Sequence, residues 1–79
     1  MQNNKSVYQN GKQLLKDTAK QLKAQSNDKP YIRYEINNQV DSICRQFDFY
    51  AMKETISQKQ ADLYKLWLSS YACQLHPKN

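Results

Sequence analysis

Four lysines in the first third of the chain recur at a spacing that places them on one face of a helix. Their separations of 4, 4 and 3 residues match a period of 3.6, and the four are Lys12, Lys16, Lys20 and Lys23. Aligned ammonium groups attract polyanions such as a phosphate backbone. A solvated helix face that only keeps a protein soluble carries the same pattern, so the stripe supports both interpretations.

The excess charge is concentrated in the same region. Residues 1–33 hold seven Lys and Arg against two Asp, a net charge of +5, whereas residues 34–79 hold five cations and five anions. Ten of the 12 cations are lysines, which meet phosphates as point charges, whereas arginine also reads guanine edges bidentately. We therefore expect contacts with a nucleic-acid backbone or an acidic protein surface, to which Lys29 and Arg33 also contribute. Five lysines on duplex DNA would give a slope of log affinity against log salt of about −4 to −5.

A second group of candidate binding residues lies on the outer face of the segment that follows. If Ile36 points inward, four side chains fall roughly opposite to it: Tyr31, Tyr34, Asn38 and Arg45. Exposed tyrosine and arginine stack on unpaired bases and also form the hot spots of protein interfaces. The alternative is that Tyr31 and Tyr34 pack over the ends of neighbouring helices.

A third group lies near the C-terminus. Leu66 and Cys73 are seven residues apart, and Leu63 flanks them. Heptad spacing of apolar residues on the back of a helix is typical of a face for a partner or for a second copy of the chain. A homodimer would also add buried area to a small core.

The residues that could support catalysis are few. Nucleophilic chemistry needs a hydroxyl or thiol beside an oriented base, but His76 is the one histidine and lies next to Pro77, which is typical of a solvated tail. Cys44 and Cys73 are 29 positions apart without a CxxC pair, which indicates reduced thiols. The single glycine argues against a glycine-rich phosphate loop. The sequence predicts no metal site, no cofactor and no enzymatic activity.

The backbone composition predicts that helices position these candidate residues. No glycine follows Gly11 and no proline lies between Pro30 and Pro77, so the tight turns of a sheet of several strands are missing. Apolar periodicity predicts three helices, over residues 6–25, from Pro30 onward and from near Ser57 to just before Pro77.

Local signals place the ends of these helices. Gly11 costs about 1 kcal/mol in a helix interior, which favours a start after it. Asp28 or Lys29 precedes Pro30 as a cap, and the pairs Ser57 with Gln60 and Thr55 with Gln58 both match the capping-box spacing. Residues 31–36 also fit a strand, although the helical period continues after them, and residues 48–56 fit a turn, a short extra helix or both.

These elements predict an all-α fold, a small three-helix bundle that is either monomeric or dimeric. Residues 1–79 form one domain with tails at 1–5 and 77–79, because a chain of 79 residues has room for a single core. The stability should be marginal. The expected core residues are Leu15, Leu22, Ile36, Val40, Ile43, Phe47, Tyr64, Trp67, Leu68 and Tyr71.

Two further interpretations have weaker support. The stretch from Ile43 to Phe49 fits a helix-turn-helix if Asp48 takes the left-handed position of the turn. Such a motif would expose Tyr50, Lys53 and Glu54. However, the motif expects an apolar residue on the next helix at the position that Glu54 occupies. A membrane-surface role for the first helix conflicts with its narrow apolar face, which lacks Trp and Phe.

The sequence thus predicts a small, basic, non-enzymatic cytoplasmic protein that associates with nucleic acid through its lysine stripe, in a regulatory or accessory role. The alternative is a protein-protein adaptor or inhibitor of a larger complex, of bacterial or phage type, in which the lysines meet an acidic surface. No membrane partner is expected, since the longest apolar run, Leu66 to Leu68, is far too short to span a bilayer.

Overall fold

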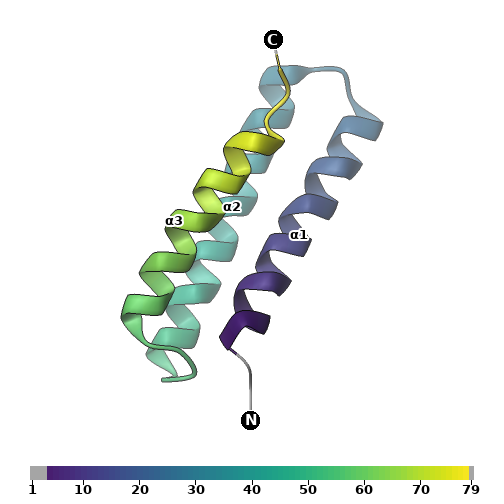
Figure 1. Ribbon diagram of the computed structural model, residues 1–79. Coiled ribbons are helices and arrows are strands. Elements are labelled where there is room, and N and C mark those ends of the chain that lie inside the picture. The colour runs from purple at the N-terminus through teal and green to yellow at the C-terminus, as the bar shows by residue number, and fades with distance from the viewer. Residues whose placement is uncertain (1–3, 79) are drawn as a thin grey trace.

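Three helices lie side by side in an elongated body in the computed structural model, which describes residues 4–78 (Figure 1). They are α1 (Asn4–Gln25), α2 (Lys29–Met52) and α3 (Gln58–Leu75). The Cα atoms extend over 41 × 19 × 16 Å. Within the described part of the chain there is no strand, which confirms the predicted three-helix bundle and contradicts the strand interpretation of residues 31–36. Of the expected tail at residues 1–5, residues 1–3 lie outside the described residues, as does Asn79, and α1 begins at Asn4.

The first helix runs through Gly11, so the expectation that it begins after this residue is wrong. Gly11 is buried against α2, and a Cβ atom there would lie 2.8 Å from Ile43 Cγ2 and 3.0 Å from Phe47 Cζ. Ile43 and Phe47 are almost fully buried and have little room to move. The missing side chain therefore lets α1 approach α2 closely, and this packing offsets the weak helix propensity of glycine.

The second helix is continuous over 24 residues. Asp28 caps it as predicted, because its Oδ1 accepts a hydrogen bond from the Tyr31 backbone N–H at 3.1 Å. Asp48 lies inside the helix, so the helix-turn-helix interpretation is wrong, and no separate short helix forms over residues 48–55. Tyr50, which that interpretation would have exposed, is half-buried.

The turn between α2 and α3 comes later than the helix-turn-helix interpretation required. Residues 53–57 form it, and Glu54 adopts the left-handed region with a φ of 64°. Of the two predicted capping boxes, Ser57 with Gln60 is the one that forms: the Gln60 backbone N–H donates to Ser57 Oγ, and the Ser57 backbone N–H donates to Gln60 Oε1, both at 3.0 Å.

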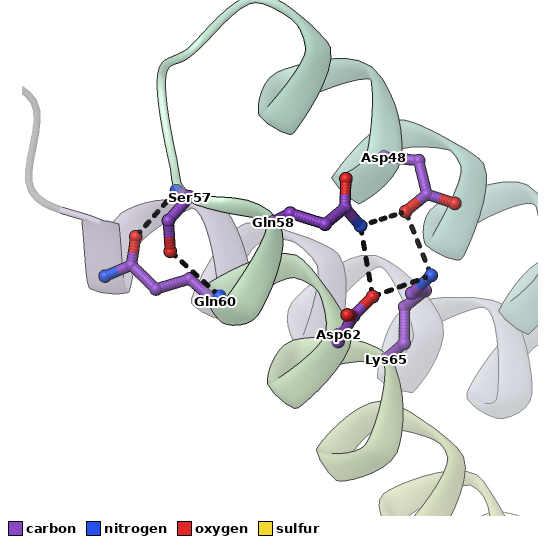
Figure 2. A network of polar contacts seen from close by, with 6 residues as sticks. All are labelled: Asp48, Ser57, Gln58, Gln60, Asp62 and Lys65. Carbon is purple, nitrogen blue, oxygen red and sulfur yellow. Dashed lines mark hydrogen bonds and ion pairs between the residues drawn. The ribbon is translucent and has the colours of Figure 1, made fainter.

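A polar network beside this turn joins α2 to α3 (Figure 2). Lys65 Nζ lies 2.9 Å from Asp48 Oδ1 on α2 and 3.3 Å from Asp62 Oδ1 on α3. Gln58 Nε2 donates to both carboxylates. The hydrogen bond from Lys65 holds the pKa of Asp48 below its ordinary value, so this carboxylate stays ionised. These charged and polar side chains therefore link the two helices and have a structural role.

Most of the predicted core residues are buried, but the prediction that Trp67 belongs to the core is wrong. This side chain is 47% exposed at the margin of α3, where its ring meets Tyr8 edge-on with the centroids 5.4 Å apart. The inner line of α3 instead carries the small residues Ala61 and Ala72, which let the helix pack closely and leave the bulkier ring at the side. Leu22 and Tyr71 are only partly buried, and Val7 and Ile56 join the core. Among the described side chains, the buried apolar residues are Val7, Leu15, Ala19, Ile32, Ile36, Val40, Ile43, Phe47, Ile56, Ala61, Tyr64, Leu68 and Ala72.

Candidate functional site

Four cations from three separate segments gather at one end of the bundle. The antiparallel course of α1 and α2 brings the last turn of α1 beside the first turn of α2, and α3 returns the C-terminal residues to the same end (Figure 1). We call this group the basic end: Lys23 from α1, Lys29 and Arg33 from α2, and Lys78 from the C-terminal residues. Two surface hollows join its members, since one is lined by Lys23, Lys29 and Lys78 and the other by Lys29 and Arg33.

The positive charge of the basic end is not neutralised within the described structure. Among residues 6–78, both ion pairs involve Lys65, whose partners are Asp48 and Asp62 and not a residue of the basic end. Asp28 is the acidic residue of the connection between α1 and α2, and its carboxylate is engaged in capping α2. Several like charges so close to one another repel, and a bound polyanion would relieve that repulsion.

The predicted lysine stripe continues from the basic end along α1. Lys16, Lys20 and Lys23 are exposed, as expected. Lys12 is half-buried, because its Nζ lies 4.7 Å from the centroid of the Tyr71 ring on α3. The stripe therefore runs along the side of α1 that faces α3, and from Lys12 to Lys23 it covers about 16 Å at the helical rise. We call Lys12, Lys16, Lys20 and Lys23 the basic track.

The four predicted residues on the outer face of α2 are all exposed. Tyr31 is 48% and Tyr34 63% exposed, so both side chains present much of their surface to solvent. The structure brings Tyr34 together with Lys29 and Arg33, because these three side chains line one hollow with Pro30 and Asn37. Asn38 and Arg45 do not line either hollow of the basic end, and Arg45 lies about 16 Å from Tyr34 along the helix axis.

The C-terminal residues contribute more than a solvated tail, contrary to expectation. His76 is half-buried, and its Nε2 hydrogen-bonds to Asn37 Oδ1 of α2 at 2.9 Å. Pro77, also half-buried, lines the hollow of Lys23 and Lys29. The contacts of His76 and Pro77 hold Lys78 near the other cations. The sequence offered no periodic signal for Asn37, His76 or Lys78, since their meeting depends on where α3 ends.

His76 reports on the basic end through its pKa, which is lowered from the ordinary histidine value of 6.5 first by burial and then by the positive charges of Arg33 and Lys23. The folded protein therefore binds the proton more weakly than the unfolded chain. The stabilisation due to neutral His76 is present above pH 6.5 and is lost as the pH falls from 6.5 through the folded-state pKa.

We predict that NMR titration of this single histidine will give a pKa below 6.5, and that Arg33→Gln will raise it because one of the repelling charges is removed. Arg45→Gln is the control, since Arg45 is not among the charges that shift His76. A pKa above 6.5, or one that both variants change equally, would contradict the described position of the histidine.

An apolar strip lies on the outer side of α3. Leu63 is 40%, Leu66 69% and Trp67 47% exposed, and Cys73 farther along the helix is also exposed. Leu63, Leu66 and Cys73 thus have the exposure predicted for a partner face. Trp67 adds to the strip, although its spacing in the sequence predicts a place in the core. Both cysteines are free, and burial raises the pKa of the half-buried Cys44 thiol, which disfavours its thiolate form.

Comparisons with known proteins assign neither a family nor a function to this chain. The sequence matches no protein-family model, and no significant match was found among curated proteins or solved structures. Across residues 4–78, no group of three or more His, Cys, Asp or Glu side chains is arranged to hold a metal ion. No helix in the same range is long and apolar enough to cross a membrane.

Proposed function

We propose that this chain is a small non-enzymatic protein that associates with nucleic acid through the basic track and the basic end. The observation that carries the proposal is the continuity of the two groups: Lys23 belongs to both, and it lines a hollow together with Lys29 and Lys78. Three segments therefore supply one extended surface of positive charge. A surface of this kind suits a polymer with evenly repeated negative charges better than a single small anion.

The residue types favour contact with phosphates over the reading of bases in a duplex. Lysine supplies all of the basic track, and Lys29 is one of the two cations that line the hollow beside Tyr34. Arg33 is the one arginine at the basic end. Lysine acts as a mobile point charge, so the expected binding to duplex DNA has little dependence on sequence. This suits a regulatory or accessory role.

A second candidate function, a protein-binding adaptor or inhibitor, is favoured by the apolar strip of α3. Leu63, Leu66 and Trp67 expose a contiguous apolar edge, and exposed tryptophan is frequent in protein hot spots. The strip and the basic end are separate surfaces, so one chain could use both. In this second candidate, the cations meet an acidic protein and not a phosphate backbone.

A binding assay with two polyanions distinguishes the candidates. Fluorescence anisotropy of labelled DNA or RNA with the full chain should show a Kd in the micromolar range at ~50 mM salt, as is typical of non-specific electrostatic binding. Polyglutamate of equal charge serves as the competitor, and it should displace the nucleic acid only weakly, because carboxylates do not reproduce the phosphate spacing. Equal or stronger binding to polyglutamate would favour the acidic-protein candidate, and no nucleic-acid binding would exclude the first.

A further inference from the structure

The hollow beside Tyr34 combines an exposed aromatic ring with two cations. Its lining residues are Lys29, Pro30, Arg33, Tyr34 and Asn37, and the Tyr34 side chain is 63% exposed. Among the described residues no aromatic ring packs on Tyr34, whereas Tyr8, Tyr64 and Trp67 pack on one another within the bundle. Tyr34 thus presents a ring to solvent that the fold itself does not use.

We infer that this hollow receives one unpaired base of a single-stranded nucleic acid, stacked on Tyr34, with Lys29 and Arg33 at the phosphates beside it. The inference rests on the proposed function and narrows it to single strands. Stacking on an aromatic side chain is the usual way in which proteins hold unpaired bases, and it tolerates any base because each has a π-face.

The size and the lining residues of the hollow fit this ligand. Its volume of about 270 Å³ lies below the roughly 300–1,000 Å³ of sites that enclose drug-sized molecules, which suits one planar group. Asn37 also lines the hollow, and its Oδ1 hydrogen-bonds to His76 Nε2 at 2.9 Å. Because the oxygen of this amide is engaged with His76, its N–H groups are the part that can donate to an acceptor on the edge of a base.

The positive charge of the hollow comes from side chains and not from the free backbone N–H groups at the start of α2. Asp28 already accepts the hydrogen bond of the Tyr31 backbone N–H, so the cap of α2 is occupied by the protein's own carboxylate. Lys29 and Arg33 are four residues apart, which places them on the same side of α2. The neighbouring hollow, lined by Lys23 and Lys78, continues the charge toward α1 and the basic track. A single-stranded nucleic acid with one base stacked on Tyr34 could therefore place its neighbouring phosphates against the cations of the basic end.

A duplex satisfies only part of this arrangement. Its phosphates can meet the basic track, but its bases are stacked inside, and one would have to leave the stack to reach Tyr34. The cations attract both forms of nucleic acid, so the preference for a single strand should depend on the exposed Tyr34 ring.

The test compares variants of the full chain on short labelled oligothymidylate and on a duplex of equal phosphate number. Tyr34→Ala should weaken binding to the single strand by about tenfold and leave duplex binding within about twofold, whereas Tyr34→Phe should retain binding because the ring remains. Phe49→Ala is the matched control, since Phe49 is 48% exposed on the same helix near its other end and should change neither affinity. Thermal melting of each variant shows that the fold is kept.

The outcomes separate the inference from the proposed function. Binding to neither nucleic acid by the unaltered chain would remove the proposed function itself. Binding to both with equal affinity, together with no effect of Tyr34→Ala or an equal effect on both forms, would overturn the single-strand inference and leave the electrostatic function in place.

Discussion

Phe47→Ala should leave much of the protein unfolded at physiological temperature. Phe47 is 1% exposed at the centre of the bundle, where its ring meets Tyr8 and Tyr64 and lies against Gly11 of α1. Removal of a buried phenylalanine ring costs about 3–5 kcal/mol. A single core in a chain of this size rarely supplies more than about 3–5 kcal/mol, so the loss is comparable to the whole free energy of unfolding. Circular dichroism at 222 nm during thermal and urea unfolding measures the effect.

The control for this variant lies two residues away. Phe49→Ala removes the same side chain from the same helix, but Phe49 is 48% exposed, and a surface change of this kind is expected within about 0.5 kcal/mol of the unaltered chain. Equal loss of helicity in both variants would show that Phe47 is not more buried than Phe49, which would contradict the described orientation of α2.

The double variant Lys16→Glu with Lys20→Glu should weaken nucleic-acid binding by at least roughly tenfold at ~0.1 M salt, because it removes two phosphate contacts and introduces two repelling charges. Both lysines are exposed in the middle of the basic track, and neither forms an ion pair within the described residues. The fold should therefore keep its melting temperature within a few degrees. The same anisotropy assay gives the affinity.

A second double variant separates the position of the charge from its amount. Lys53→Glu with Lys59→Glu also lowers the formal charge by four, from +5 to +1, but these exposed residues lie at the end of the bundle opposite to the basic end. It should retain most of the affinity if binding occurs at the basic track. Equal losses in the two double variants would mean that only the net charge matters.

The starts of α2 and α3 were predictable because local chemistry determines them. Asp28 and Ser57 are side chains whose oxygens satisfy the first backbone N–H groups of a helix, and neither needs a distant partner. The inward residues of α2 were also recognisable, since Ile36, Val40 and Ile43 follow one helical period and are all buried.

The errors arose where packing between helices decides the outcome. Trp67 and Leu68 are adjacent in the periodic pattern, which cannot distinguish the centre of a buried face from its margin, and only Leu68 is fully buried. Gly11 is unfavourable by propensity alone, and the reason for its place in α1 is the closeness of Ile43 and Phe47 on another helix.

Only the part of the candidate site that lies on a single helix was predictable from the sequence. The lysines of the basic track share one helix, so their spacing was sufficient to identify them. Lys78 and His76 reach the basic end only because α3 ends beside the start of α2, and the contact of Lys12 with Tyr71 likewise joins two helices. Contacts between residues so far apart in sequence leave no periodic pattern along the chain.

The salt dependence of binding to single-stranded nucleic acid tests the central claim most directly. Six exposed cations are available at the basic track and the basic end: Lys16, Lys20, Lys23, Lys29, Arg33 and Lys78. If most of them meet phosphates, a plot of log affinity against log salt for the unaltered chain should be linear with a slope of about −3 to −4. A slope near zero, or no binding at the lowest salt, would show that this surface does not serve a phosphate backbone.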